Sequence, residues 1–254
     1  MPRRKRDLRL YAPYLRRITF DASSAPDMGA YPFCLPLFKS GFDLAFDNPV
    51  TIIVGENGSG KSTLLEGIAA LVGFDVAGGA KGYRPVDHSI ALEIDGCDLA
   101  KALKARWLPK VGTGWFFRAE SFFSVARYLD LAATETGKPP PDFLSHSHGE
   151  GFLRFFEERC ERQGIYIFDE PESALSPSRQ MLFLRLLARM EASRVCQVVM
   201  ATHSPILMAY PNAKLLLMDK CGLEPVSLED TTHFRLWREF FADPATFIES
   251  MMED

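Results

Sequence analysis

The sequence predicts an α/β fold in which helices flank a mostly parallel sheet. Short apolar runs that end in polar residues alternate with segments of helical spacing. In the segment 177–190, for example, one helix face collects Phe183, Leu186, Leu187 and Met190. Strands that alternate with helices are typical of a parallel sheet covered on its faces. With 254 residues, the chain is long enough for one large domain of this kind.

The expected elements follow one another along the chain. Residues 1–49 mix short apolar stretches with proline and glycine, which indicates antiparallel strands and turns. Beyond them we expect strands at 50–54, 90–94, 114–117, 165–168 and 197–201, and helices at 62–72, 100–107, 121–133, 148–160 and 177–190. The tail from Ala213 predicts a strand or hairpin and a final amphipathic helix.

Composition excludes several classes of protein. Hydrophobic residues make up 47% of the chain and charged residues 24%, so global disorder is excluded. The apolar runs are far shorter than the ~20 residues that cross a bilayer, so we expect no membrane insertion. A net charge of −4 disfavours a protein covered with nucleic acid. Five cysteines without a C-x-x-C pair indicate reduced thiols and a cytoplasmic location.

Residues 55–62 match the complete phosphate-binding loop pattern G-x-x-x-x-G-K-[ST] between a predicted strand and a predicted helix. Glycines let the backbone curl so that several N–H groups meet one anion, and the helix adds its positive end. Lys61 would reach the β and γ phosphates, and the Ser62 hydroxyl would bind Mg²⁺. We therefore expect the nucleotide at Gly55, Glu56, Asn57, Gly58, Ser59, Gly60, Lys61, Ser62 and Thr63.

A second acidic motif closes the apolar run 165–168. Asp169 and Glu170 follow it directly, and carboxylates at the end of a buried strand need a cation or hydrogen bonds. This is the Walker B arrangement of phosphoryl-transfer sites. Asp169 would hold Mg²⁺ through water, and Glu170 would polarise the attacking water.

His203 follows the apolar run 198–201. A single histidine usually has a structural role, and that alternative stays open. The position favours function, because ligands of open α/β sheets bind at the carboxyl ends of the strands. The residue also lies 203 − 170 = 33 positions after Glu170, which leaves room for one helix and one strand. A neutral imidazole there could donate a hydrogen bond to a γ-phosphate oxygen.

The tetrapeptide of Ser147, His148, Gly149 and Glu150 has two interpretations. As S-x-x-E it is a capping box that starts a helix. The same hydroxyl and free N–H groups could instead bind a phosphate of a nucleotide held elsewhere. It precedes Asp169 by 169 − 149 = 20 residues, counted from Gly149.

The order of these motifs, with Ser173-Ala174-Leu175-Ser176 before His203, resembles an ABC-type ATPase. More narrowly it is similar to the stand-alone ATPases near the SMC-like and RecF-like branch, over roughly residues 50–205. The resemblance implies an ABC-type head, a P-loop NTPase with an antiparallel β portion and a small helical lobe. It also implies that ATP and Mg²⁺ are held between two head-to-tail copies, where residues 147–150 cap the partner's γ-phosphate and Glu170 acts as general base.

Within this resemblance we expect one domain over residues 1–254. The antiparallel portion would be 1–49, the nucleotide-binding core 50–73 and 161–254, and the variable helical lobe 74–160. Residues 147–150 stand where most relatives have Ser-Gly-Gly-Gln, and Ser176 stands in place of Asp. Arg118 or Glu120 occupies the region of the usual Gln. Only 26 residues, 121–146, separate the Phe117-Arg118 segment from the signature, too few for coiled-coil arms.

Other functions remain open on sequence. The chain could be the ATPase subunit of a membrane transporter or a non-hydrolysing nucleotide-dependent adaptor, whereas a GTPase is disfavoured because no [NT]-K-x-D motif occurs. An unknown protein partner is compatible with each. Nucleic-acid binding would rest on two basic clusters: Arg3 to Arg6, and Lys101, Lys104, Arg106 and Lys110 around Trp107. A solvated helix face explains the second cluster equally well.

Overall fold

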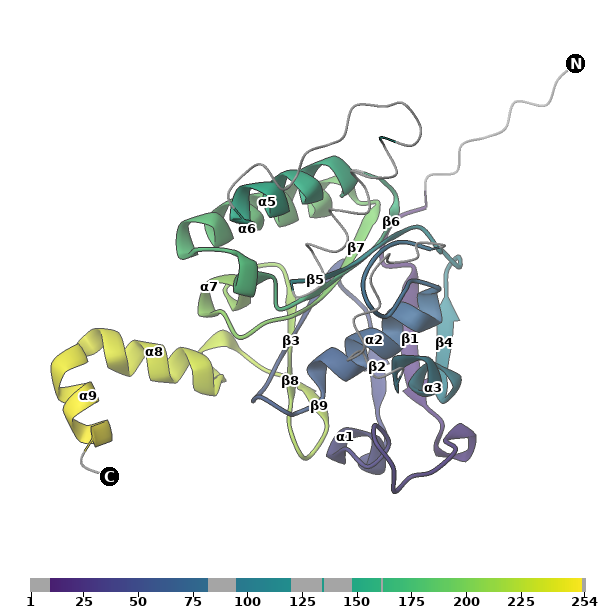
Figure 1. Ribbon diagram of the computed structural model, residues 1–254, viewed down its shortest axis with the longest axis horizontal. Helices are drawn as coiled ribbons and strands as arrows, with labels where there is room; N and C mark the ends of the chain where they lie inside the picture. Colours follow the sequence, from purple (N-terminus) through teal and green to yellow (C-terminus); the bar gives the residue numbers. More distant parts are fainter. Residues whose placement is uncertain (1–9, 82–94, 120–133, 135–147, 161, 253–254) are drawn as a thin grey trace, which may run out of the picture.

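The computed structural model describes residues 10–81, 95–119, 134, 148–160 and 162–252 (Figure 1). Its strands are β1 Leu15–Phe20, β2 Asp43–Ala45, β3 Val50–Val54, β4 Leu103–Trp107, β5 Gly114–Arg118, β6 Gly164–Asp169, β7 Cys196–Ala201, β8 Lys214–Met218 and β9 Leu223–Pro225. Its helices are α1 Pro36–Ser40, α2 Lys61–Val72, α3 Asp95–Lys101, α5 His148–Arg159, α6 Pro177–Ser193, α7 Pro205–Met208, α8 Thr232–Ala242 and α9 Pro244–Met252. Three short 3-10 turns are η1 Ala22–Ser24, η2 Pro171–Ala174 and η3 Leu228–Asp230.

The strands form two sheets, and the predicted α/β class with a mostly parallel sheet is confirmed. The large sheet has the order β5-β6-β7-β3-β8-β9, with β5 to β8 parallel and β9 antiparallel at its edge. The small sheet is antiparallel, with the order β2-β1-β4. The strands expected at 50–54, 114–117, 165–168 and 197–201 and the helices expected at 62–72, 148–160 and 177–190 all form.

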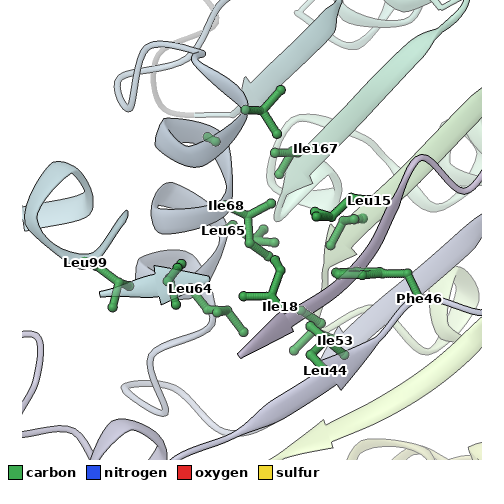
Figure 2. Close-up of a cluster of buried hydrophobic side chains, with 14 of the residues drawn as sticks. Leu15, Ile18, Leu44, Phe46, Ile53, Leu64, Leu65, Ile68, Leu99 and Ile167 are labelled. Carbon is green, nitrogen blue, oxygen red and sulfur yellow. The ribbon is translucent and has the colours of Figure 1, made fainter. Parts of the chain in front are cut away.

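Helix α2 lies between the two sheets and forms the centre of one hydrophobic core. Figure 2 shows Leu65 and Ile68 of α2 beside Ile18 of β1, Ile53 of β3 and Ile167 of β6. All five side chains are fully buried. Because α2 begins directly after the phosphate-binding loop, this packing fixes the loop against both sheets.

Helices α5, α6 and α7 cover the opposite face of the large sheet and form the second core. Its centre is aromatic: the ring of Phe168 on β6 stacks on Phe117 with centroids 4.9 Å apart and meets Phe156 and Phe183 edge-on. Such aromatic contacts add to the stabilisation from area burial. Because Phe168 precedes Asp169, the core also anchors the strand end that carries the acidic pair.

One buried polar side chain joins the two sheets. Gln197 of β7 accepts hydrogen bonds from the backbone N–H groups of Tyr14 and Leu15 at 2.8 and 2.9 Å, and its amide donates to the Leu15 carbonyl at 2.9 Å. A buried amide would be costly without such partners. Its bonds fix β1 against the large sheet.

The prediction of a helix at residues 100–107 is wrong. Helix α3 ends at Lys101, and residues 103–107 form β4, which pairs antiparallel with β1. Buried Leu103 is followed by alternately exposed and half-buried residues, the two-residue period of a strand. The small sheet therefore takes its third strand from beyond residue 49. The elements expected at 90–94 and 121–133 lie outside the described residues.

The chain ends in two helices, where a single one is expected from sequence. Helix α8 ends at Ala242 and α9 starts at Pro244, and both project from the body of the molecule (Figure 1). Their aromatic residues pack mainly on one another, and neither helix has a fully buried residue. Within the described part of the chain, no helix combines the length and the apolar character needed to span a bilayer.

Replacing Leu65 by Ala tests the role of α2 between the sheets. The side chain is fully buried, so we expect a loss of about 2–5 kcal/mol in the free energy of unfolding, from lost burial and the cavity left behind. The measurement is urea denaturation followed by circular dichroism. In the matched control Leu182→Ala, a 47% exposed position of α6, the change should stay within about 0.5 kcal/mol. Equal losses in the two variants would contradict the central position of α2.

Candidate active site

Three parallel strands in register place the predicted site residues at one edge of the large sheet. Ala201 of β7 lies opposite Ile53 of β3 and Asp169 of β6. The residues that follow therefore leave the sheet at the same edge, where β3 continues into the phosphate-binding loop, β6 into Glu170 and β7 into His203. The fold therefore brings these three motifs to one edge of the sheet.

The loop of residues 55–60 has the backbone that its glycines predict. Gly58 and Gly60 have φ angles of +75° and +99°, in the left-handed region that favours glycine. At Gly55 a side chain is excluded by lack of space, because a Cβ there would lie 2.3 Å from the backbone oxygen of Met218. The Lys61 ammonium donates to the carbonyls of Gly55 and Glu56 at 2.9 and 3.0 Å. The loop thus curls tightly around the start of α2.

Beside the loop lies a small hollow of about 190 Å³. Tyr31, which carries no motif in the sequence, forms part of its wall, and the phenol oxygen lies 2.6 Å from the Thr63 hydroxyl. The hollow brings loop, helix start and acidic strand end together. Its lining consists of Tyr31, Leu35, Asn57, Gly58, Gly60, Lys61, Ser62, Thr63 and Glu170.

The two predicted metal-binding residues are in contact. The Ser62 hydroxyl donates to Oδ1 of the nearly buried Asp169 at 3.0 Å. A hydroxyl and a carboxylate are the hard oxygen donors that Mg²⁺ prefers. The pair therefore fits a site in which phosphate oxygens and water complete the coordination.

Charged groups around Asp169 are closely paired. Arg118 lies with Nε 3.6 Å from Oδ2 of Asp169, and its Nη1 donates to Glu66. Of the two residues expected in place of the family's Gln, Arg118 reaches the site, while Glu120 lies outside the described residues. Burial lowers the pKa of Lys61. The carboxylates of Glu170 and Asp169 oppose this shift, because their negative charges favour the charged ammonium.

Glu170 has a backbone conformation that is rare for its residue type. Its φ and ψ are 47° and 55°, in the left-handed region. Hydrogen bonds hold this turn: its N–H donates to the Ala201 carbonyl at 3.0 Å, and its carbonyl accepts from Ser173 at 3.0 Å. Such strain is concentrated at functional sites. Here it accompanies a residue that lines the hollow with a side chain that is 39% exposed.

His203 connects three parts of the site. Its Nε2 lies 3.4 Å from Oε1 of Glu170, and its Nδ1 lies 2.9 Å from Nε2 of His233. Its backbone N–H donates to Oε1 of Glu172 at 2.6 Å. Burial, helped by the charge of Lys61, lowers the pKa of His203, and burial also lowers the pKa of His233. Burial raises the pKa of Glu172.

Sequence reasoning misses two further residues that shape this edge. Buried Gln180 of α6 accepts a hydrogen bond from the Ser204 hydroxyl and donates to the Leu175 carbonyl at 3.1 Å, so it connects the turns after β6 and β7. His233 comes from the first turn of α8, thirty residues after its partner. Neither has a local sequence signal, because each acts through a tertiary contact.

The predicted signature residues lie only partly within the described residues. Ser147 is outside them, and α5 begins at His148, with Gly149 and Glu150 in its first turn. The helix contacts α6 and the η2 turn. Ser176 lies at the N-cap position of α6. Contact between residues 147–150 and a second nucleotide stays a prediction.

The basic cluster near Trp107 is largely paired. Lys101 forms an ion pair with Asp98 at 2.5 Å, and Lys104 forms one with Asp21 at 2.6 Å. Lys110 places its ammonium 5.7 Å from the centre of the Trp107 ring. These contacts favour a solvated protein surface there, while Arg3 to Arg6 lie outside the described residues.

Two family models match different parts of the chain. One, described as "AAA domain, putative AbiEii toxin, Type IV TA system", matches residues 125–209, and another, described as an AAA domain, matches residues 34–106. Between them they include the loop, the acidic strand end and His203. These matches support the predicted resemblance to P-loop ATPases near the SMC-like and RecF-like branch.

Individual relatives match the chain more loosely. An OLD nuclease of Thermus scotoductus is 41% identical over 56 residues, which are 22% of this chain and 11% of that protein. The SMC head domain from Thermotoga maritima covers 85% of this chain and all of its own, with 15% identity and a TM-score of 0.44. The structure of cbiO1 from Clostridium perfringens, part of the ABC transporter complex cbiONQ, covers 96% of this chain and 99% of its own. Its sequence identity is 16% and its TM-score is 0.46. With TM-scores below 0.5, the two structural likenesses are loose.

Substituting Gly55 by Ala tests the tight fit of the loop against β8. We expect Gly55→Ala to lose about 1–3 kcal/mol more unfolding free energy than Gly222→Ala, because its methyl group meets the Met218 backbone. Gly222 is a matched control, since its φ of +144° is close to the +157° of Gly55 while nothing lies near its added Cβ. Thermal and urea unfolding measure both. Similar losses would show that the loop tolerates the methyl group.

The two half-buried histidines predict a loss of stability on acidification. Their folded-state pKa values are lowered from the ordinary 6.5, so the unfolded chain binds protons more readily than the folded one. Their stabilising contribution is present above pH 6.5 and is lost as the pH falls. Urea denaturation at about pH 7.5 and about pH 5.5 should show a larger loss for the natural chain than for the double variant His203→Gln, His233→Gln. An equal loss of stability in the natural chain and in the double variant would contradict the direction of these pKa shifts.

Proposed function

We propose that this P-loop ATPase binds ATP with Mg²⁺ and hydrolyses it between two copies of the chain. One observation carries the proposal: Glu170, in a strained turn, lines the same hollow as Ser62, whose hydroxyl donates to Asp169. A carboxylate near the γ-phosphate end of a phosphate-binding loop is placed to accept a proton from water.

Each part of the chain has a distinct role in the proposed reaction. Backbone N–H groups of residues 55–62 and the Lys61 ammonium bind the phosphates, where Lys61 exchanges its bonds to the loop carbonyls for bonds to phosphate oxygens. Bound through Ser62 and Asp169, Mg²⁺ would neutralise charge on those oxygens. Glu170 accepts the proton of the attacking water, and His203 donates a hydrogen bond from Nε2 to a γ-phosphate oxygen.

The second copy completes the site in this proposal. Glu170 lines the hollow and its side chain is 39% exposed, so this part of the site is accessible from solvent. The start of α5 carries free N–H groups that can bind an anion, and the family resemblance assigns it to the partner's nucleotide. Residues 147–150 of each copy would thus cap the ATP held by the other.

The downstream task belongs to nucleic-acid maintenance or defence in this proposal, in the cytoplasm and with a further protein partner. The similarity to an OLD nuclease over 56 residues and the family model that names an AbiEii toxin support this direction. The match spans about a tenth of that nuclease, so the proposal takes from it only the connection to nucleic acid.

Replacing Glu170 by Gln tests hydrolysis and dimerisation together. The amide keeps the shape of the side chain and cannot accept the proton, so we expect the ATPase rate to fall about 10²- to 10⁴-fold. Because ATP then persists, the variant should elute as a dimer with Mg²⁺-ATP and as a monomer without it. Phosphate release and light scattering after gel filtration measure the two effects.

Glu157→Gln is the matched control for this charge change. Glu157 is exposed on α5 and pairs with Arg189, so its variant should keep the natural rate. An unchanged rate in Glu170→Gln would overturn the assigned general base. ATP binding by the natural chain without any hydrolysis would overturn the proposed activity and favour a nucleotide-dependent adaptor.

A further inference from the structure

His233 belongs to no sequence motif, yet its ring contacts the ring of His203 at the active site. It lies in the first turn of α8, whose start is fixed by the buried Thr231: the Thr231 hydroxyl accepts from the Phe234 N–H at 3.2 Å. It also lines a cavity of about 560 Å³ beside residues 55–59 of the loop. We propose that His233 is a positioning residue that keeps the proton of His203 on Nε2.

The hydrogen-bond donors and acceptors around the ring of His203 determine which of its nitrogens carries the proton. A neutral imidazole carries one N–H donor and one acceptor nitrogen. Two ring nitrogens 2.9 Å apart, Nδ1 of His203 and Nε2 of His233, are stabilised only when one donates and the other accepts. The other nitrogen of His203, Nε2, faces the Glu170 carboxylate at 3.4 Å, and an ionised carboxylate only accepts.

Among the arrangements in which both rings are neutral, only one satisfies both contacts. With the proton of His203 on Nε2, an N–H faces the carboxylate of Glu170, and Nδ1 accepts from Nε2–H of His233. The opposite arrangement would place the lone pair of Nε2 against that carboxylate, which is repulsive. The lowered pKa values of both rings agree with two neutral histidines, because burial disfavours the charged form of each ring.

This tautomer has a consequence for hydrolysis, and that step rests on the proposed function. A γ-phosphate oxygen accepts hydrogen bonds, so it needs Nε2–H and is repelled by a bare Nε2. His233 does not line the small hollow of residues 57–63, and it acts on the reaction through His203. A group that fixes the tautomer of a catalytic histidine acts in this way in hydrolases.

Nitrogen NMR of the histidine side chains in the full chain tests the tautomer directly. The chain has five histidines, and the spectra of His203→Gln and His233→Gln identify the two signals. We expect His203 with its proton on Nε2 in the natural chain and a mixture of tautomers in His233→Phe, which keeps a ring but cannot donate. A natural chain with the proton on Nδ1, or an unchanged tautomer in His233→Phe, would overturn the proposal.

Kinetics supply a second readout and a conservative rescue. In His233→Phe we expect kcat to fall roughly 10- to 100-fold, as for other partners that orient a functional histidine, with little change in the KM for ATP. His233→Gln can still donate an N–H to Nδ1 and should recover most of the loss. Arg238→Gln, an exposed change on α8, serves as the control and should leave kcat unchanged.

The two measurements separate this proposal from the proposed function. If the natural chain does not hydrolyse ATP, the activity assignment fails while the NMR result still decides the role of His233. If hydrolysis occurs and both His233→Phe and His233→Gln keep the natural kcat and tautomer, the positioning role fails alone. A melting curve for each variant shows whether it is folded.

Discussion

The register of three parallel strands is the constraint on which the site depends. Ile53, Ala201 and Asp169 lie in one row across β3, β7 and β6, so the loop, His203 and Glu170 leave the sheet together. A shift of one residue in any strand would turn its side chains to the opposite face. The cores on both sides of the sheet, around α2 and around Phe168, oppose such a shift because each fits one set of faces.

Several charged side chains lie close together at this edge of the large sheet, and the buried ones need hydrogen-bond or ion-pair partners. Asp169 has the Ser62 hydroxyl and Arg118 beside it, and Lys61 donates to two loop carbonyls. Glu172 accepts from the His203 backbone. An isolated charge there would cost several kcal/mol, whereas these contacts replace much of the lost hydration. The edge can therefore hold opposite charges close together before any nucleotide binds.

Sequence predicts the parts of this site that are written in consecutive residues. Residues 55–62, the Asp169–Glu170 pair and His203 stand at strand ends, and strand ends are visible as apolar runs meeting polar ones. What sequence misses depends on contacts between distant segments. Gln197 accepts hydrogen bonds from the backbone at β1, more than 180 residues away in the chain. The segment of β4 is predicted as a helix because its partner strand β1 also lies far away in the chain.

The site combines groups that must exchange partners with groups that are already placed. Lys61 and Ser62 bond to the protein itself, and in the proposed reaction each would turn toward phosphate or metal when a nucleotide enters. The side chains of Glu170 and His203 already lie beside each other, next to the strained turn after β6 and the ring of His233. In the proposed reaction, binding would thus fall to side chains that can adapt, and water activation to side chains that the fold has fixed. This division explains why the strain lies at Glu170, because a proton acceptor acts best when its geometry precedes the substrate.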